Sequence, residues 1–416
     1  MLHTPEGTTH TPTSSTTSAQ LVTSPAGGVP HIVDTPEALA HAVRQLASGN
    51  GPFAIDAERA SSFRYGQDAY LIQVKRAASG IHLIDPRAFD TLAPLATVLA
   101  EDEWVLHAAD QDLPCLDDLG LRPPSLFDTE IAAHILNYER IGLSSVLENR
   151  LGVLLAKEHS SADWSTRPLP SQWLAYAALD VEFLLPLREL LMQDLVDAGK
   201  DEWAKQEFEH VRTAPPPAPK LDPWRHTPGS GEIRTTRGLA VLRELWLTRD
   251  SIAQSEDLSP SKVLGNKALV AASVHLPADR RRLGAMPEFR SKSAKAHMSS
   301  WAKAISKALA LDEDQLPERR APKRIDATPD PRNWHRHSPD ALIRLEAIRH
   351  CLREEAQDLG IPPEVLLAPK TQRRSAWLLP FDCTVSEVKK VLAADKARPW
   401  QIAQVALPIT HSLRSE

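Results

Sequence analysis

Short apolar runs alternate with longer segments of helical period in the first half of the chain. Runs bounded by turn-forming residues predict β-strands, and the longer segments predict helices. Three early strands followed by alternating helices and strands indicate a mixed α/β sheet. The five predicted strands are Phe53–Asp56, Tyr70–Val74, Ile81–Ile84, Trp104–His107 and Leu126–Phe127. The predicted helices are Thr91–Leu99, Asp110–Leu119, Thr129–Asn137 and Gln172–Leu191.

The second half of the chain carries only helical patterns. Within Ser293–Leu309, apolar residues recur at spacings of three and four, as on the buried face of an amphipathic helix. Lysines lie off this stripe. They could belong to an ordinary solvated helix face or to a face that binds phosphate, because both are rich in lysine. The stripe consists of Ala294, Met298, Trp301, Ile305 and Leu309.

Two proline-rich stretches, Thr213–Gly231 and Leu316–Pro339, divide the chain. Such stretches are typical of semi-rigid linkers, because proline fixes φ and has no backbone N–H. The start of the chain, rich in Thr, Ser, Pro and Gly, predicts a disordered tail. We therefore expect a tail at 1–30, an α/β domain at 31–212, a linker at 213–231, a helical domain at 232–312, a second linker at 313–339 and a further helical domain at 340–416.

Composition limits the compartment and the cofactors. The tail does not resemble a secretory signal, and no apolar run reaches the roughly 18 residues of a membrane helix, which predicts a cytoplasmic protein without a membrane partner. The three cysteines lie far apart, which argues against disulfides and structural zinc.

The net charge of −6 conceals an asymmetry. Residues 1–219 hold 15 Lys and Arg against 30 Asp and Glu, whereas residues 220–416 hold 33 against 24. An acidic part beside a basic part suits carboxylates that bind cations next to a module that holds a polyanion. Two ordinary domains with unequal surface charge would show the same balance.

Acidic residues stand where sheet proteins place catalytic groups. Asp56 ends the first predicted strand and Glu58 comes two residues later, and both could face one cation because alternate side chains of a strand point the same way. Asp112 lies in the first turn of the helix after the fourth strand, where an acid also favours the helix dipole. The rival assignments near it are Asp110, Asp117 and Asp118.

Tyr176 and Asp180 form the last of these sites. A spacing of four places them on one helix face, one turn apart. Each acidic site is weak evidence alone, but the four carboxylates together would bind two divalent cations at a separation of roughly 3.5–4 Å. Oxygen ligands select Mg²⁺ or Mn²⁺, one to activate water and one to stabilise a leaving 3′-oxygen. The tyrosine hydroxyl could position that water.

These residues resemble a known family. The ordered set of Asp56, Glu58, Asp112, Tyr176 and Asp180 is similar to the motifs of the DEDD exonucleases, in the branch with tyrosine in the last motif. The stretches that resemble ribonuclease D are His107–Asp112, Ala162–Leu169 and Tyr176–Val181, and the first of them favours Asp112 over Asp110. The stretches Leu242–Leu245 and Ser259–Leu269 resemble the HRDC domain, of which residues 340–416 would be a second, more divergent copy.

The resemblance implies a ribonuclease H-like exonuclease fold with a mixed five-stranded sheet, followed by all-α HRDC-type domains. It implies hydrolytic removal of 3′ nucleotides from RNA, including tRNA precursors, by a chain that we expect to be a monomer without cofactors beyond its metals. Asp56 would contact both metals, Glu58 and Asp180 the water-activating metal, and Asp112 the second. Ala57 and Arg59 replace Thr and Phe of many relatives, which bears on substrate preference.

Basic residues and one histidine are candidate nucleic-acid contacts, although each could equally be structural or solvated. Two other functions stay open at this point. The same carboxylates serve DNA exonucleases, and a chain that only kept the fold could bind nucleic acid without cleaving it. The candidate contacts are His107, Lys157, Arg167, Arg290, Lys292 and Lys295.

Overall fold

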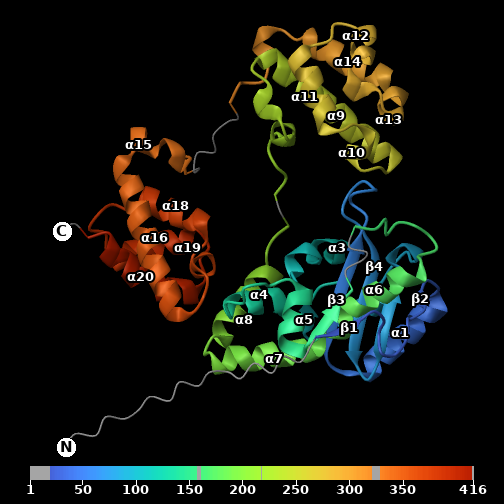
Figure 1. Cartoon of the computed structure of the whole chain (residues 1–416), viewed down its shortest axis with the longest axis vertical. Helices are drawn as coiled ribbons and strands as arrows, with labels where there is room; N and C mark the ends of the chain where they lie inside the picture. The colour runs from blue at the N-terminus through green and yellow to red at the C-terminus, as the bar shows by residue number, and fades with distance from the viewer. Residues whose placement is uncertain (1–18, 157–160, 217, 321–327, 415–416) are drawn as a thin grey trace, which may run out of the picture.

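The computed structural model describes residues 19–156, 161–216, 218–320 and 328–414 (Figure 1). An α/β unit forms the first part of the chain, and two helical units follow it. Each unit has a hydrophobic cluster of its own. This matches the expected order of one α/β and two helical domains, and their bounds remain a proposal. Lys157 lies outside the described residues.

A six-stranded mixed sheet is the centre of the α/β unit, with the strand order β2-β5-β4-β3-β6-β7. β3, β4 and β5 are antiparallel neighbours, and the other pairs are parallel. The expected number of five strands is wrong, because an edge strand of two residues is too short to leave a pattern. The strands are β2 Ile32–Val33, β3 Asn50–Arg59, β4 Ala69–Ala77, β5 Gly80–Ile84, β6 Trp104–Leu106 and β7 Leu126–Asp128.

A second, small sheet joins β1 (Gln20–Val22) to β8 (Val153–Leu155) in parallel. The prediction of a disordered tail over 1–30 is therefore wrong for Gln20–Val22. The register pairs Leu21 with Leu154. These strands lie far apart in the sequence, so a local pattern could not predict their pairing.

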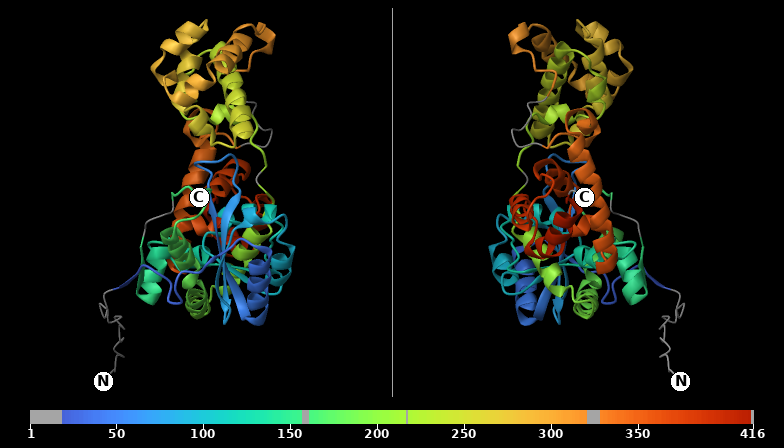
Figure 2. Two further views of the ribbon diagram at one scale, coloured as in Figure 1. Left: turned by 90° about the vertical axis from the view of Figure 1, so that its right-hand side faces the viewer. Right: turned by 90° about the vertical axis from the view of Figure 1, so that its left-hand side faces the viewer.

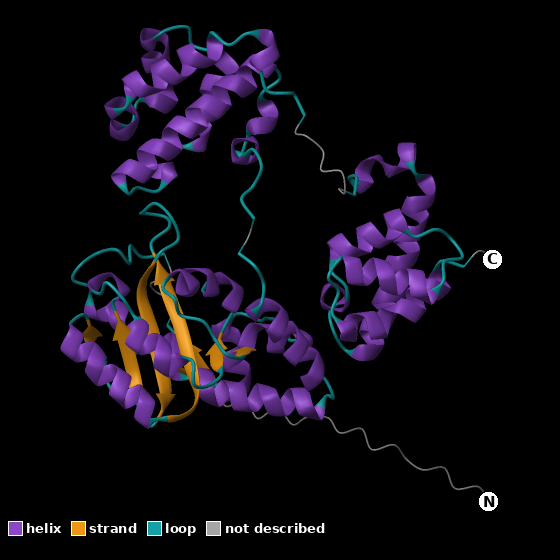
Figure 3. Ribbon diagram, turned by 180° about the vertical axis from the view of Figure 1, so that it is seen from behind, coloured by secondary structure: helices purple, strands orange, loops and turns teal. Residues whose placement is uncertain are grey.

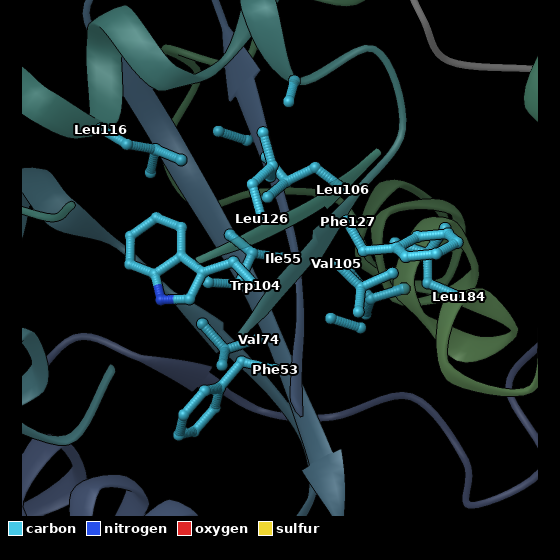
Figure 4. Close-up of a cluster of buried hydrophobic side chains, with 14 of the residues drawn as sticks. Phe53, Ile55, Val74, Trp104, Val105, Leu106, Leu116, Leu126, Phe127 and Leu184 are labelled. Carbon is cyan, nitrogen blue, oxygen red and sulfur yellow. The ribbon is translucent and has the colours of Figure 1, made fainter. Parts of the chain in front are cut away.

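The core of the α/β unit packs side chains of β3, β4, β6 and β7 against surrounding helices (Figure 4). Phe53 and Trp104 are fully buried neighbours across the β3–β6 pair. The Trp104 indole N–H donates to the carbonyl of Leu99 at 2.7 Å, so this large side chain is buried without an unpaired polar atom. This packing fixes the central strand that carries the first two carboxylates.

Eight helices of the described residues belong to the α/β unit. One expected helix, Gln172–Leu191, is broken at Phe183 into two. Pro186 explains the break, since its ring would clash with the carbonyl of Glu182 in a continuous helix. The ammonium group of Lys75 donates to that carbonyl at 2.5 Å. The helices are α1 Pro36–Ser48, α2 Ala93–Leu99, α3 Leu113–Asp118, α4 Thr129–Ile135, α5 Leu143–Leu151, α6 Ser171–Glu182, α7 Leu184–Asp197 and α8 Asp201–Arg212.

The second unit is built on the long helix α9. The stripe predicted in Ser293–Leu309 is largely buried, but the helix is interrupted at His297. The predicted linker 213–231 is wrong over Pro223–His226, because Trp224 lies in this unit's core. The helices are α9 Thr236–Glu256, α10 Pro260–Val263, α11 Asn266–His275, α12 Arg280–Ala285, α13 Lys292–Ala296 and α14 Met298–Leu309.

The third unit repeats the beginning of the second. Its first three helices after α15, namely α16, α17 and α18, are 21, 4 and 10 residues long, as are α9, α10 and α11. The predicted linker 313–339 is wrong at Trp334, which is fully buried in this unit. The helices are α15 Trp334–His337, α16 Pro339–Leu359, α17 Pro363–Leu366, α18 Pro369–Leu378, α19 Val385–Ala394 and α20 Pro399–Ser412.

Both helical units contact the α/β unit, at different places (Figures 2 and 3). The turn after α9 meets the loop between β3 and β4, where the N–H of Ser259 donates to the carbonyl of Phe63 at 3.0 Å. The third unit packs on α8, where the rings of Trp203 and Trp400 stack at 4.8 Å. Among the described residues, no helix is long and apolar enough to cross a membrane.

Candidate active site

Three carboxylates from two elements meet on one face of the central strand. Asp56 and Glu58 occupy alternate positions of β3, and α6 crosses this strand and brings Asp180 to the same face. One oxygen from each of the three side chains lies within 4.8 Å of the others. The sequence spacing and the strand alternation thus place these groups close enough to share a cation.

Asp112 joins them from a neighbouring strand. It lies after β6, directly before α3, rather than within the helix's first turn as expected. Its carboxyl group and that of Asp56 form a side-chain hydrogen bond. We refer to Asp56, Glu58, Asp112 and Asp180 as the carboxylate site.

The turn that presents Asp112 depends on Asp128, which was not among the predicted site residues. Ala108 has φ 58° and ψ 53°, a left-handed conformation that is unfavourable for residues with a Cβ. The fully buried Asp128 holds it there, accepting from the N–H groups of Ala108 at 3.2 Å and Ala109 at 2.7 Å. The same carboxylate caps α4. The sequence can indicate the helix cap, which is local, but not the contact of Asp128 with Ala108 and Ala109, about 20 positions away.

Burial perturbs every member of the carboxylate site. Desolvation raises the pKa of Asp56 to about 6 and that of Asp112 to about 8, and it raises the pKa values of Glu58 and Asp180 well above the ordinary range. The negative charges of the neighbours add to the effect at Glu58, Asp112 and Asp180. Asp112 is buried and the other three carboxyl groups are half-buried, so cations would be needed to keep all four ionised, and these residues fit a divalent-metal site.

Tyr176 lies one turn before Asp180 on α6, and their side chains form a hydrogen bond. Burial and the nearby carboxylates raise the pKa of the Tyr176 hydroxyl. The phenol therefore keeps its proton and can donate it in a hydrogen bond to an oxygen at the edge of the carboxylate site.

The predicted nucleic-acid contacts divide into three groups. Burial lowers the pKa of His107 to about 4, so its ring is neutral, and its Nδ1 lies 2.9 Å from the hydroxyl of Thr129. His107 directly follows β6, the strand that pairs in parallel with β3. Exposed basic side chains on the second unit form the next group, away from the carboxylates: Arg290, Lys292 and Lys295.

The contacts of Arg167 inside the protein contradict the prediction that its guanidinium binds the phosphate of a nucleic acid. Its guanidinium binds both carboxylate oxygens of Asp85, at 2.6 and 2.8 Å. Its remaining N–H groups donate to the carbonyls of Tyr70, Trp164 and Thr166. Every donor of the guanidinium is thus used inside the protein, and Arg167 holds the 164–167 segment against the sheet.

Three family models match the chain in the order of its units. A 3′-5′ exonuclease model matches residues 30–196, an HRDC domain model matches residues 238–305, and a 3′ to 5′ exonuclease C-terminal domain model matches residues 327–413. The ribonuclease D of Nitrobacter hamburgensis is 32% identical over 324 residues, which cover 74% of this chain and 75% of that protein. This chain belongs to the ribonuclease D family.

Solved structures agree with this membership of the ribonuclease D family. A protein from Bifidobacterium adolescentis is 35% identical, with a TM-score of 0.87 over 95% of this chain and 99% of that one. The RNase D of Escherichia coli, described as an exoribonuclease involved in structured RNA processing, shares the fold with a TM-score of 0.66 at 24% identity, over 92% of this chain and 99% of that one. The predicted family and fold class are confirmed, and the chain is a 3′→5′ exoribonuclease.

Proposed function

We propose that this ribonuclease D family member hydrolyses RNA from the 3′ end with two divalent cations, Mg²⁺ or Mn²⁺, held by the carboxylate site. The observation that carries the proposal is the convergence of these four partly or fully buried carboxyl groups, three of which each place an oxygen within 4.8 Å of the others. Asp56 would contact both cations, Glu58 and Asp180 the first, and Asp112 the second. Cations at such a site activate water for attack on phosphorus and stabilise the leaving 3′-oxygen.

Tyr176 and His107 would act on the substrate side of this site. The Tyr176 hydroxyl, which stays protonated, would orient the attacking water through a hydrogen bond. Neutral His107 has its Nδ1 engaged with Thr129, so its other ring nitrogen is available to a polar group of the RNA. Both residues would therefore position reactants while the carboxylate site holds the cations.

The substrate that we propose is a structured RNA with an extended 3′ end, such as a tRNA precursor. The relative from Escherichia coli is described as acting in structured RNA processing. Residues 220–416 carry nine more basic than acidic side chains, which favours contacts with phosphate along an extended RNA. Arg290, Lys292 and Lys295 would be among these contacts. We further propose that the chain works as a cytoplasmic monomer.

A 5′-labelled single strand and a 3′-extended tRNA, incubated with and without chelator, test the proposal. We expect 3′ shortening with either cation and none with chelator. Asp56→Asn and Asp180→Asn should abolish shortening but leave RNA affinity nearly intact. Asp112→Asn should also abolish it, whereas Asp110→Asn, at the exposed neighbouring acid, is the matched control and should keep activity.

Other outcomes would favour the alternative functions. Faster shortening of a matched DNA strand would make the chain a DNA exonuclease. Tight RNA binding without any metal-dependent shortening would make it a silent scaffold. Near-normal hydrolysis by Asp56→Asn or Asp180→Asn would contradict the two-metal assignment.

A further inference from the structure

A positive charge lies inside the carboxylate site. Arg59 is the last residue of β3, and its guanidinium Nη2 lies 3.6 Å from Oδ1 of Asp112. The side chain of Asp112 is only 8% exposed and that of Arg59 27%, so water screens this ion pair less than a surface pair. The Arg59 charge also acts on Asp56 and Glu58, where it opposes the larger effect of burial on their pKa values.

Arg59 also faces a pocket of about 190 Å³ beside Glu58. Three serines and Phe63 also line this pocket; the serines are Ser61, Ser62 and Ser161. A phosphodiester bound at a cation held by Glu58 could enter this pocket. Arg59 thus borders both the carboxylate site and a space that the reacting phosphate could occupy.

We infer that Arg59 is a built-in cation of the carboxylate site, which competes with the divalent ion at Asp112 and faces the reacting phosphate once that ion is bound. The inference rests on the proposed function and adds a residue to it. A divalent cation bound at Asp112 would repel the guanidinium that lies 3.6 Å from this carboxylate, so entry of the metal should displace Arg59. The phosphate of the substrate is an anion that could then receive the guanidinium.

Two opposite effects follow from one side chain. A positive charge close to Asp112 weakens the binding of a second cation, because like charges repel. The same charge stabilises the negative charge that develops on the phosphate oxygens in the transition state. Removing the charge should therefore tighten metal binding and slow the chemical step, whereas a merely structural role would do neither.

The test is Mn²⁺ binding to the full chain by calorimetry, together with RNA hydrolysis at saturating Mn²⁺. Arg59→Met removes the charge at similar length and should tighten the weaker Mn²⁺ site about threefold to tenfold. Its kcat should fall by about tenfold or more, with KM for RNA changed less. Arg59→Lys keeps the charge and should bind Mn²⁺ within about twofold of the natural protein. Should Arg59→Met fail to fold, Arg59→Gln replaces it.

Arg87→Met is the matched control, since Arg87 is an exposed arginine paired with Asp68 at 3.2 Å and should change neither quantity. Unchanged or weaker Mn²⁺ binding in Arg59→Met would overturn the inference. Tighter binding with unchanged kcat would overturn the contact with phosphate. If the natural protein bound no Mn²⁺, or bound it equally well as Asp56→Asn, the proposed function itself would fail.

Discussion

At the scale of single residues, the carboxylate site brings together carboxyl groups whose ionisation is unfavourable in the folded protein. The raised pKa values mean that the folded, metal-free protein keeps protons that the unfolded chain releases. The site therefore costs little stability below the ordinary carboxyl pKa of about 4, and it destabilises the fold as pH rises through about 6 and about 8, the pKa values of Asp56 and Asp112.

The effect of a divalent cation on stability should follow this titration. We expect Mg²⁺ or Mn²⁺ to raise the melting temperature by several degrees at about pH 8 and hardly at all at about pH 5, where protonated carboxyl groups bind cations poorly. Thermal melts with cation and with chelator measure the difference. Asp56→Asn should remove most of it, and an equal shift at both pH values would contradict the charge argument.

Individual residues differ in how far the sequence could predict them. The convergence of Asp56, Glu58 and Asp180 was predictable, because strand alternation and helix spacing are local properties and the ordered motifs resemble a known family. Arg167 was misjudged because its partner, Asp85, lies 82 positions earlier in the chain. A long-range ion pair leaves no local pattern, so the same arginine looks free in the sequence.

At the scale of elements, the turn between β6 and α3 decides where Asp112 points. Asp128 on β7 holds this turn and the first N–H groups of α4 with one carboxylate. We expect Asp128→Ala to lower the free energy of unfolding by about 2–3 kcal/mol, because a helix cap is lost and buried N–H groups lose their acceptor. The kcat should fall at least about tenfold, since Asp112 is displaced.

Urea unfolding and hydrolysis of a short RNA measure these two effects. Thr35→Ala is the control, because Thr35 also caps a helix, α1, by accepting from the N–H of Ala38 at 3.2 Å. It should cost about 1 kcal/mol without loss of activity. Loss of stability without loss of kcat in Asp128→Ala would show that the turn does not position Asp112.

Elements themselves were predictable in type more than in extent. The break between α6 and α7 follows from Pro186, so it is a local property that the sequence contains. The edge strand β2 and the pairing of β1 with β8 depend on neighbours distant in the chain. Propensity therefore identified the central strands and missed those that exist only through pairing.

At the scale of the whole molecule, a partly buried ion pair connects the third unit to α8. Glu207 accepts from the guanidinium of Arg398 at 2.6 Å and from the indole N–H of Trp400 at 2.7 Å. Glu207→Ala should weaken this docking by about 3 kcal/mol, because it leaves the charge of Arg398 without its partner. We expect a larger radius in solution scattering and faster proteolysis between the second and third units.

The same variant should leave the hydrolysis of a short RNA unchanged, since the carboxylate site is elsewhere. Glu209→Ala on the same helix is the control, because Glu209 is exposed and pairs only locally with Arg212. An unchanged radius in Glu207→Ala would mean that stacking of Trp203 on Trp400 suffices for docking. Proline content alone predicted linkers over Trp224 and Trp334. Both side chains are instead buried in the cores of the helical units, which proline content cannot indicate.

The two helical units use corresponding turns differently. After α9, the side chain of Asp257 accepts from Arg64 and from the N–H of Tyr65; after α16, it is the main-chain carbonyl of Gly360 that accepts from Lys200, at 2.8 Å. A contact made by the main chain survives most changes of side chain. Changes of side chain in the turn after α16 should therefore weaken docking less than a change of Asp257 in the turn after α9.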